Sequence, residues 1–509
     1  MEHSADNNHN RLCAIRIGID TYQESVVYMR DDCHICRAEG FGVQTRVEVQ
    51  AGESSIIARL NVVESDAGVL PPGHIGLSKI AWERLALTDG SEVVVGHPAW
   101  VNSLSYVRRK VFDRPLTSNQ FHAIVRDILK GRYTDIHIAG FLTACSNRLD
   151  IDEIAHLTHA MVDVGSRLSW PGTDVVVDKH CIGGLPGNRT TPIVVSIVAA
   201  AGLTMPKTSS RSITSPAGTA DTMEVITPVD LDLERIRRVV REQGGCLAWG
   251  GNVRLSPVDD ILIRVEKAMD LDSQGQLVAS VLSKKIAAGS THVLIDIPVG
   301  PTAKVRSKTA AKALKRVFEQ VGARLGLVVQ PVITDGIQPI GRGIGPAFEA
   351  EDVLAVLSNQ DGAPDDLRRR ALFLAGKILE MAKSEAQGRG EDRAVHLLNS
   401  GAAWDKFKSI CIAQGGFRER PPVPAYRYSV LADRNGMVKA IDNRKLARLA
   451  KLAGAPNAPA AGVRLLVKVD DSVSHGDCLF ELCAETSGEL KYAQTYLEQT
   501  TGMIQFRPS

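Results

Sequence analysis

Residues 174–188 read Asp174-Val-Val-Val-Asp-Lys-His-Cys-Ile-Gly-Gly-Leu-Pro-Gly-Asn188. The β-branched run over 174–177 predicts a short strand, and the glycines that follow predict a loop over 178–188. The apolar run that starts at Ile193 then predicts a buried helix. A strand, a glycine loop and a helix in this order indicate an α/β fold with a largely parallel or mixed sheet.

Further strands and helices continue this pattern along the chain. Two strands and two helices are expected to alternate, at 293–297, 307–325, 327–329 and 350–358. We therefore predict an α/β domain that consists of residues 171–256 and 288–420.

The segment before this domain has the apolar period of α-helices, as Phe121, Ile124 and Ile128 show. This period predicts an all-helical lobe over residues 115–170. Residues 257–287 are helical again, although they follow the first part of the α/β domain. We therefore predict that the helical lobe is discontinuous and is continued by 257–287.

The N-terminal part of the chain predicts a small β-barrel over residues 12–101, preceded by a disordered tail over 1–11. Short alternating runs lie between Gly and Asp turns, at 14–19, 45–49 and 56–62. Residues 76–85 have helical spacing, and a strand is expected at 92–95. This order of strand, short helix, turn and strand resembles a double-psi barrel.

The C-terminal part predicts an α+β module over residues 421–509, because the composition shifts after Pro421-Pro-Val-Pro. Within it we expect a strand at 427–431, a helix at 443–453 and a turn-rich β stretch over 463–484.

The composition excludes several classes of protein. The net charge of +2 lacks the basic excess of a nucleic-acid-binding protein, so no nucleic-acid partner is expected. The longest apolar stretch, 193–203, is far shorter than the ~20 residues that cross a bilayer. A polar N-terminus without an apolar signal segment leads us to expect a cytoplasmic protein with no membrane partner.

The nine cysteines are scattered, which argues against a disulfide framework as the basis of this fold. The close pair Cys33 and Cys36 has no second pair at zinc spacing, so we interpret both as ordinary cysteines and expect no metal site.

The glycine loop over 178–188 is the first candidate site. A strand that ends in glycines before a helix leaves backbone N–H groups that can face an anion. Lys179 adds a positive charge, and Gly183 and Gly184 allow the backbone to approach a phosphate closely. The loop matches neither GxxxxGK[ST] nor GxGxxG, so a tight strand-to-helix turn remains the alternative.

The second candidate site is the window 208–224, which contains four serines, four threonines and an arginine in 17 residues. Hydroxyl groups donate to phosphate oxygens and accept from ribose hydroxyls, so this composition suits a sugar-phosphate site. The alternative is a polar surface loop.

The third window is Ser280-Val-Leu-Ser-Lys-Lys285 on a predicted helix, where Ser280 and Lys284 share a face because they are four residues apart. Arg264 lies one helical stretch earlier. Together these side chains could bind the carbonyl oxygens of a flat ligand. A solvated helix face is the alternative for the two lysines.

These three windows, in this order, resemble the thymidine phosphorylase family of pentosyltransferases over about residues 115–490. The quoted signatures are Ser210-Arg-x-x-x-x-x-x-Gly-Thr-x-Asp-x-x-Glu224 and Leu157-Thr-His-Ala-Met161 with Leu168-Ser-Trp170. The N-terminal barrel and the string Gly187-Asn-Arg-Thr-Thr-Pro192 are still more similar to a longer branch of the family. That branch comprises archaeal AMP phosphorylases and their bacterial relatives.

The resemblance implies a role for each matching residue. The attacking phosphate would be held by Lys179, Gly183, Gly184, Ser209 and Thr219. The base would be surrounded by His180, Arg264, Ser280 and Lys284, with His180 as a proposed proton donor. In the AMP phosphorylase branch the matching substrate positions are Gly184, Ser210, Arg211, Ser212, Ile213, Thr214, Ser215, Thr219, Ser280 and Lys304. There Asp272 is the proton donor, so two residues compete for that role.

The family often has Ser where this chain has Cys181, and a thiol is a weaker hydrogen-bond donor than a hydroxyl. We interpret this difference as retuning of the phosphate loop and not as loss of the site. A nucleophilic Cys181 beside Lys179 is the alternative.

The resemblance implies phosphorolysis of thymidine to thymine and 2-deoxyribose 1-phosphate, with inorganic phosphate as co-substrate and no cofactor or metal. The alternative within the family is phosphorolysis of a nucleoside 5′-monophosphate (AMP, CMP or UMP) to ribose 1,5-bisphosphate, with Lys304 at the extra phosphate. Partners are then a nucleoside or nucleotide and a second copy of the chain, in a homodimer or a higher homo-oligomer.

Two other functions compete with phosphorolysis. The first is a phosphoribosyltransferase of the anthranilate type, which needs Mg²⁺ on its diphosphate substrate. Asp259 and Asp260 could serve that ion, although such a pair also suits the start of a helix. The second is a non-catalytic adapter built around the N-terminal barrel.

Overall fold

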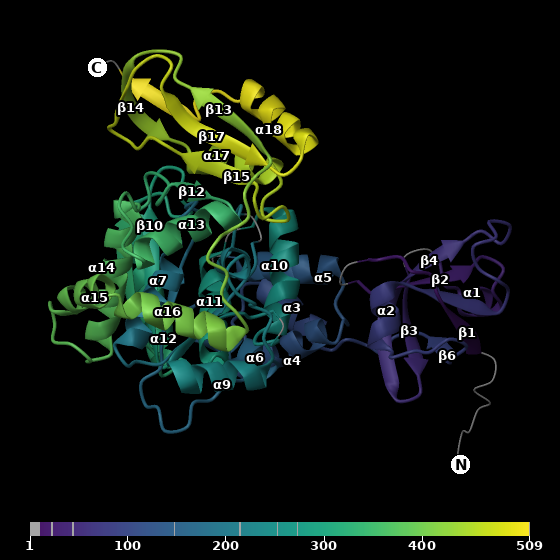
Figure 1. Cartoon of the computed structure of the whole chain (residues 1–509). Helices are drawn as coiled ribbons and strands as arrows, with labels where there is room; N and C mark the ends of the chain where they lie inside the picture. The colour runs from purple at the N-terminus through teal and green to yellow at the C-terminus, as the bar shows by residue number, and fades with distance from the viewer. Residues whose placement is uncertain are drawn as a thin grey trace. The chain divides into compact units, whose positions relative to one another are not determined.

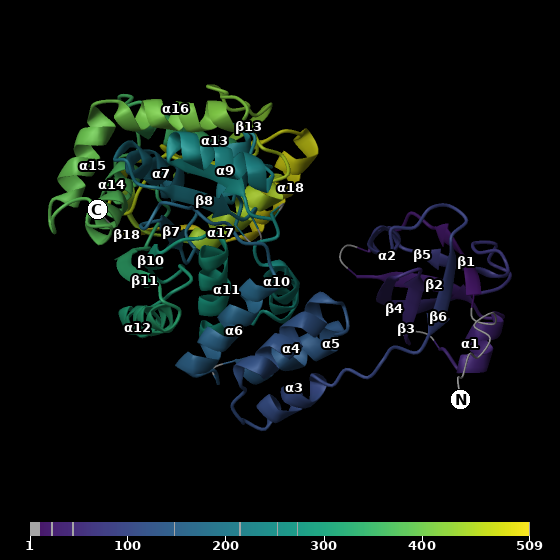
Figure 2. The same ribbon diagram turned by 90° about the horizontal axis from the view of Figure 1, so that it is seen from below.

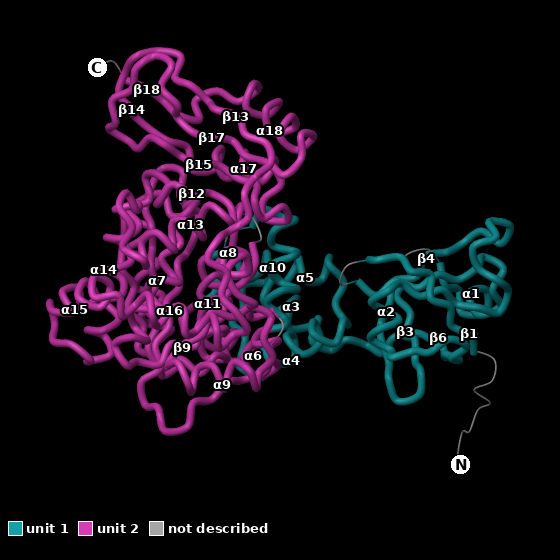
Figure 3. The backbone as a smooth tube through the Cα atoms, in the orientation of Figure 1, with its two compact units in different colours: residues 1–149, 257–273 teal, residues 150–256, 274–509 magenta. Residues whose placement is uncertain are grey.

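The computed structural model describes residues 11–21, 24–42, 45–146, 148–212, 215–251, 253–271 and 273–507. It consists of two compact units, each assembled from two stretches of chain (Figure 3). The first is Met1–Leu149 with Pro257–Ser273, and the second is Asp150–Ser256 with Gln274–Ser509. The border between Leu149 and Asp150 lies inside the predicted helical lobe. The other predicted domain borders stay predictions.

A closed six-stranded barrel forms the N-terminal part of the first unit (Figure 1). Its strands, in spatial order, are β1 (Arg11–Arg16), β5 (His74–Leu77), β2 (Val26–Arg30), β4 (Ser54–Val63), β3 (Arg46–Ala51) and β6 (Glu92–Gly96). Two short helices, α1 (His34–Glu39) and α2 (Lys79–Arg84), complete it. The predicted barrel is confirmed. Two of its pairings are parallel, β1 with β5 and β2 with β4, while the double-psi topology stays a prediction.

One barrel prediction was wrong in detail. Gly76 and Leu77 were expected to begin a helix, but they end strand β5, and α2 begins only at Lys79. No side chain would fit at position 76, because a Cβ there would lie 2.1 Å from Ile17 Cδ1. The packing of the barrel thus overrides the helical spacing of this segment.

Four helices form the rest of the first unit: α3 (Leu104–Val111), α4 (Ser118–Leu129), α5 (Asp135–Cys145) and α10 (Pro257–Met269). Phe121, Ile124 and Ile128 on α4 are buried, as their period predicts. Helix α10 packs against α4 and α5 although more than a hundred residues separate them along the chain. The helical part is therefore discontinuous, as expected. The predicted helical segment 257–287 is in fact two helices, α10 and α11 (Gln274–Ala287).

Parallel strands form the core of the second unit (Figure 2). Strand β10 (His292–Val299) pairs in parallel with β7 (Val177–Cys181) and β11 (Val328–Asp335), and β8 (Met205–Ser209) pairs with β9 (Gly245–Trp249). A parallel bridge between Val176 and Thr204 joins the two groups of strands. The predicted parallel α/β sheet is therefore confirmed.

Helices surround these strands. Helix α12 packs against β10 and β11, while α7, which is buried along its length, contacts β8 and β9. The helices of this part are α6 (Ile151–Asp163), α7 (Thr190–Ala200), α8 (Thr219–Glu224), α9 (Leu233–Gln243), α11, α12 (Lys308–Arg324), α13 (Pro346–Leu357), α14 (Asp365–Met381), α15 (Gly390–Asn399) and α16 (Ala402–Gln414). Helix α6 packs against α11. No helix among the described residues is both long and apolar enough to cross a membrane.

The C-terminal module has α+β structure, as expected, with two small antiparallel sheets. One sheet contains, in order, β12 (Gly343–Ile344), β15 (Gly462–Leu465), β17 (Cys478–Ala484) and β13 (Tyr426–Leu431). The other contains β16 (Ser472–Val473), β14 (Gly436–Ile441) and β18 (Ile504–Arg507), and the helices are α17 (Asn443–Leu452) and α18 (Ser487–Gln499). Because β12 precedes the module in sequence, its pairing with β15 links the module to the α/β domain.

Strand β7 is displaced along the chain from its predicted position. The prediction placed the strand at 174–177 and the loop from 178, whereas the strand runs from Val177 to Cys181. Apolar runs identify buried strands, but Asp178 and Lys179 are charged and nevertheless almost fully buried.

Asp178 is accommodated because two buried lysines surround it. Its carboxylate lies 3.1 Å from Lys207 Nζ and 2.8 Å from Lys285 Nζ. Burial alone would raise the pKa of Asp178, but the two lysines outweigh it and lower that pKa. Lys207 Nζ also donates to the backbone oxygen of Lys179 at 2.9 Å. These three charged residues fix the backbone of β7 where the glycine loop begins.

We expect Asp178→Asn to lower the free energy of unfolding of the protein by about 3–5 kcal/mol, since it leaves two buried ammonium groups without their carboxylate. Urea unfolding followed by circular dichroism measures this loss. The matched control is Asp174→Asn at an exposed position on the same segment, which should change stability by less than about 0.5 kcal/mol. Equal stability of the two variants would contradict this role of Asp178.

Candidate functional site

The candidate site lies where β7 and β8 end. The carboxyl ends of parallel strands lie at the same edge of a sheet, where α/β proteins bind ligands. Strand β7 ends at Cys181 and β8 ends at Ser209, so Lys179 and His180 share this edge with Ser209. Two of the three windows found in the sequence are thus brought together within the second unit.

Lys179 is fully buried and lies close to the first turn of α7. Its Nζ donates to Thr190 Oγ1 at 2.6 Å and lies 3.5 Å from Thr191 Oγ1. Burial lowers the pKa of Lys179 from its usual value, while the carboxylate of Asp296 acts in the opposite direction. A buried ammonium group whose direct contacts are hydroxyls is a strong site for an anion.

The glycine loop has the backbone shape that its sequence predicts. Gly183 and Gly184 have φ of 94° and 80°, in the region that favours glycine. A Cβ on Gly183 would meet nothing within 4 Å, so there is open space on the side where a side chain would lie. A Cβ on Gly184 would lie 2.3 Å from the backbone nitrogen of Lys304. The loop therefore needs glycine at Gly184, and Lys304 lies directly beside it.

The hydroxyl-rich window continues from the end of β8. Ser209 Oγ is buried and has no hydrogen-bond partner within the described residues, which suits a hydroxyl that binds a ligand. Ser210 and Ser215 are exposed, and the backbone N–H groups of Ser212 and Gly218 donate to Asp221 at 2.6 and 2.7 Å. Ile213 and Thr214 lie outside the described residues.

Arg211 has a structural contact that its predicted substrate role did not anticipate. Its guanidinium donates to Glu224 at 2.7 Å and lies 4.8 Å from the ring centroid of Trp249. The hydrogen bond to Glu224 raises the pKa of Arg211 further above its usual value. These contacts hold Arg211 against α8 and β9.

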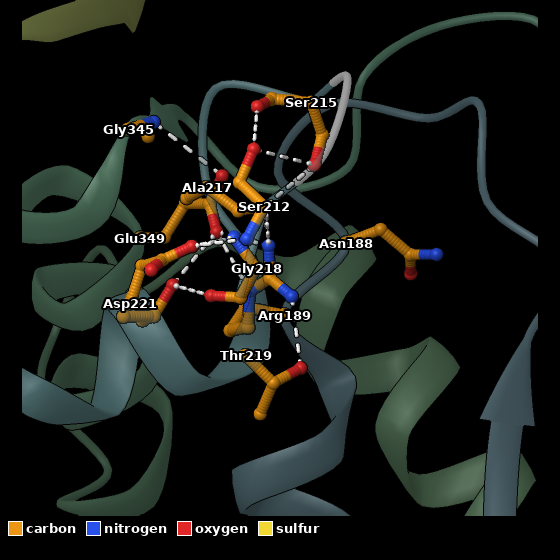
Figure 4. Close-up of polar contacts among 12 residues, drawn as sticks. Asn188, Arg189, Ser212, Ser215, Ala217, Gly218, Thr219, Asp221, Gly345 and Glu349 are labelled. Carbon is orange, nitrogen blue, oxygen red and sulfur yellow. Dashed lines mark hydrogen bonds and ion pairs between the residues drawn. The ribbon is translucent and has the colours of Figure 1, made fainter. Parts of the chain in front are cut away.

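Thr219 at the start of α8 is connected to the glycine loop through Arg189 (Figure 4). Arg189 Nη1 donates to Thr219 Oγ1 at 2.9 Å, and Nε donates to Glu349 Oε2 at 2.7 Å. Glu349 is buried on α13, and burial raises its pKa to about 7 although Arg189 lowers it.

His180 follows Lys179 on β7 and lies near enough to the third window for Lys284 and Lys285 to affect its pKa. Ser280 and Lys284 share a face of α11, as predicted, with Lys284 Nζ 3.4 Å from Ser280 Oγ. Burial lowers the pKa of His180 well below its usual value, and Lys285, Lys207 and Lys284 lower it further. His180 is therefore neutral at pH 7 and can donate a hydrogen bond, but it is a poor source of a proton.

The two remaining predicted residues belong to the first unit of the chain. Arg264 on α10 makes a bidentate ion pair with Asp135 on α5, with distances of 2.6 and 2.7 Å. This pair is an electrostatic contact inside the helical part. Asp272, the competing proton donor, lies outside the described residues.

Cys181 does not have the environment of a nucleophile. Burial and the nearby carboxylate of Asp296 raise the pKa of its thiol to about 12. Asn188 Nδ2 lies 3.4 Å from its sulfur. The alternative of a nucleophilic Cys181 is therefore not supported, since the thiol stays protonated near neutral pH.

Sequence reasoning missed several residues of this site. Arg189 lies inside the quoted string Gly187–Pro192, and its position directly after the glycine loop is a signal from which it could have been predicted. Glu349 gives no such signal, because it is 160 residues further along the chain.

Asp259 and Asp260 lie in the first turn of α10. Within the described ranges no group of three His, Cys, Asp or Glu side chains could hold a metal ion.

The fold is similar to that of a solved structure. Anthranilate phosphoribosyltransferase from Thermus thermophilus matches with a TM-score of 0.51 and 18% sequence identity, over 60% of this chain and 98% of that one. At this identity the similarity concerns the fold alone.

Two family models also match the chain. The helical bundle domain of a glycosyl transferase family matches residues 104–165, and the a/b domain of a glycosyl transferase family matches residues 173–404. All three windows lie inside the second match.

Curated relatives match along nearly the whole chain. "Putative thymidine phosphorylase 1" of Acidovorax sp. (strain JS42) is 58% identical over 98% of this chain and 97% of its own length. "Putative thymidine phosphorylase" of Maricaulis maris (strain MCS10) is 56% identical over 97% of this chain and 95% of its own length. "Putative thymidine phosphorylase" of Legionella pneumophila (strain Paris) is 55% identical over 96% of this chain and 94% of its own length. The chain therefore belongs to the thymidine phosphorylase family of glycosyl transferases.

Proposed function

We propose that this enzyme catalyses phosphorolysis of a pyrimidine nucleoside, converting thymidine and phosphate to thymine and 2-deoxyribose 1-phosphate. The observation that carries the proposal is buried Lys179 before the glycine loop, together with the Ser209 hydroxyl at the end of β8, which has no partner among the described residues. Such an arrangement suits a phosphate ion. The names of the relatives support the same reaction.

Lys179, Ser209, Thr219 and the N–H groups of Gly183 and Gly184 would hold phosphate against the anomeric carbon. Holding both reactants turns a bimolecular encounter into a positioned one. The C–N glycosidic bond breaks through an oxocarbenium-like state, the base leaves with the electron pair, and a phosphate oxygen forms the new C–O bond. No enzyme nucleophile is needed, which agrees with the protonated thiol of Cys181.

The leaving base carries developing negative charge, which Lys284 of the second unit would stabilise. The family resemblance implies the same role for Arg264. Ser280 would bind a carbonyl oxygen of the base. Burial and the neighbouring lysines lower the pKa of His180, so we infer that it contributes a hydrogen bond to the base. Asp272, which the AMP phosphorylase branch implies as the acid, stays the candidate proton donor.

The alternative substrate is a nucleoside 5′-monophosphate, which brings two further negative charges. The position of Lys304 supports this alternative, because its backbone and Cβ lie beside Gly184 and a second phosphate would need a cationic partner such as its ammonium group. The product would then be ribose 1,5-bisphosphate.

The two rival functions have less support. A magnesium-dependent phosphoribosyltransferase rests on a fold similarity at 18% identity, whereas the thymidine phosphorylase relatives are 55–58% identical. A non-catalytic adapter would not need a buried Lys179 beside a Ser209 hydroxyl that the described part of the chain leaves without a partner.

We further propose that the enzyme is a cytoplasmic homodimer or higher homo-oligomer that uses phosphate as co-substrate and needs no cofactor. The nine cysteines all lie in the described ranges, and all are free thiols there, which agrees with a reducing compartment.

We expect the purified protein to release free base from thymidine, uridine, AMP, CMP or UMP only when phosphate is present. Liquid chromatography of each reaction identifies the substrate and separates the nucleoside alternative from the nucleotide alternative. Turnover should persist in a chelator such as EDTA, because the proposed positive field comes from lysines and backbone dipoles. Absence of base release from all five compounds would contradict phosphorolysis, and loss of activity in EDTA would favour the magnesium-dependent rival.

We expect Lys179→Ala to lower kcat/KM by at least about 10²-fold, because it removes a buried charge that contacts the transferred phosphate. The matched control is Lys439→Ala, which removes an exposed lysine in the C-terminal module and should leave the rate unchanged. Circular dichroism verifies that both variants fold. If Lys179→Ala keeps most of its activity, the phosphate site is elsewhere.

The neutral state of His180 predicts how stability depends on pH. The pKa of His180 in the folded protein lies well below the unfolded value of about 6.5. The contribution of His180 to the free energy of unfolding is therefore complete above about pH 6.5 and is lost as the pH falls below it. The slope for this one proton approaches about 1.4 kcal/mol per pH unit. Urea unfolding between pH 7 and pH 5 should show a smaller loss for His180→Gln than for the wild type. Parallel curves would show that His180 binds its proton at the same pH in the folded and the unfolded protein, so that folding does not lower its pKa.

A further inference from the structure

Arg189 occupies the junction between the glycine loop and helix α7. It is the residue immediately before α7, and each part of its guanidinium donates to a different partner. Besides its bonds to Thr219 and Glu349, Nη2 donates to the backbone oxygen of Ala217 at 2.9 Å (Figure 4). A planar fork of donors is suited to bridging several acceptors at fixed angles. Arg189 thus connects the glycine loop to the hydroxyl-rich window.

Glu349 supports this fork from a third segment. Its side chain is 1% exposed and also accepts from Thr222 Oγ1 at 3.1 Å and from the backbone N–H of Gly345 at 3.4 Å. Thr222 is on α8, and Gly345 precedes α13. The carboxylate therefore contacts the end of the glycine loop, α8 and the start of α13 at once.

The direction of the bond to Thr219 determines what that hydroxyl can do. Arg189 donates to Thr219 Oγ1, so the oxygen is used as an acceptor. The hydroxyl hydrogen then remains available for donation to another group. A phosphate oxygen is an acceptor, so this arrangement prepares Thr219 to bind phosphate.

We propose that Arg189 and Glu349 are positioning residues for phosphate, which hold Thr219 and the segment around Ala217 at a fixed place beside the glycine loop. The inference rests on the proposed phosphorolysis and deepens it. Neither residue needs to touch the ion: Arg189 acts through Thr219, and Glu349 acts through Arg189. The alternative is that the pair only stabilises the fold.

The first experiment compares two buried carboxylates. Glu349→Gln replaces the carboxylate that accepts from Arg189 with a neutral amide. The matched control is Glu380→Gln on α14, where a mostly buried glutamate pairs with Lys377 at 2.9 Å and takes no part in the site. Isothermal titration calorimetry measures the affinity for inorganic phosphate, steady-state kinetics give both KM values, and urea unfolding gives stability.

We expect both variants to be less stable than the wild type, but only Glu349→Gln to bind phosphate roughly tenfold more weakly. The reason is that the charge-assisted bond between Glu349 and Arg189 is lost, and Arg189 then no longer holds Thr219 in place for phosphate. The KM for the nucleoside should stay within about twofold. An unchanged phosphate affinity in Glu349→Gln, or an equal loss in both variants, would overturn the proposal in favour of a purely structural role.

Arg189→Lys provides a second variant that keeps a positive charge near Glu349. Lysine cannot reach Glu349, Thr219 and Ala217 together, because it lacks the fork. We therefore expect a roughly tenfold weaker phosphate affinity with less loss of stability than in Glu349→Gln. Wild-type affinity in Arg189→Lys would overturn the positioning role.

The calorimetric readout separates this inference from the proposed function. If the wild type binds phosphate but releases no base, phosphorolysis fails while the comparison of phosphate affinities still decides the role of Arg189 and Glu349. If the wild type releases base and both variants bind phosphate normally, only the positioning role fails. If the wild type binds no phosphate, both fail together.

Discussion

The buried ion cluster of Asp178, Lys207 and Lys285 is the constraint on which the candidate site depends. Charged side chains are buried in proteins only when they are paired and hydrogen-bonded. Asp178 meets that condition through two lysines from β8 and α11, and the backbone oxygen of Lys179 accepts from Lys207 as well. The cluster therefore fixes where Lys179 leaves the sheet. Burial lowers the pKa of the nearby His180, and the two lysines of the cluster lower it further.

A second electrostatic element connects segments that are distant in sequence. The fork of Arg189 joins the glycine loop to α8, and Glu349 on α13 holds the fork. Both elements use one buried carboxylate to hold cationic groups from other parts of the chain. The difference lies in the outcome: the Asp178 cluster organises the strand, whereas the Arg189 fork organises a hydroxyl. In the proposed reaction, Lys179 and Thr219 would then face the same anion.

The sequence predicted the architecture well because periodicity and turn residues are local. The helical period of the apolar residues identified α4 and α12. Gly183 and Gly184 of the loop have positive φ, which glycine adopts without strain. Strand β7 was placed too early because two of its residues, Asp178 and Lys179, are charged. The burial of Asp178 depends on lysines that are 29 and 107 residues away, which no local pattern can reveal.

The family resemblance and the local composition predicted part of the candidate site. Lys179, the glycines and Ser209 lie at one edge of the sheet, as the motifs imply, while Arg211 makes a structural contact that composition could not foresee. Glu349 has no motif of its own and appears only when the chain is folded.

Phosphorus NMR of the protein incubated with thymidine and inorganic phosphate tests phosphorolysis most directly. We expect a new phosphate monoester signal, that of 2-deoxyribose 1-phosphate, which grows as the inorganic phosphate signal falls and as free thymine appears in equal amount. For the nucleotide alternative, AMP in place of thymidine should give a bisphosphate with two ester signals. Free base formed without any new phosphate ester would mean hydrolysis, and would contradict a site built to deliver phosphate to the sugar.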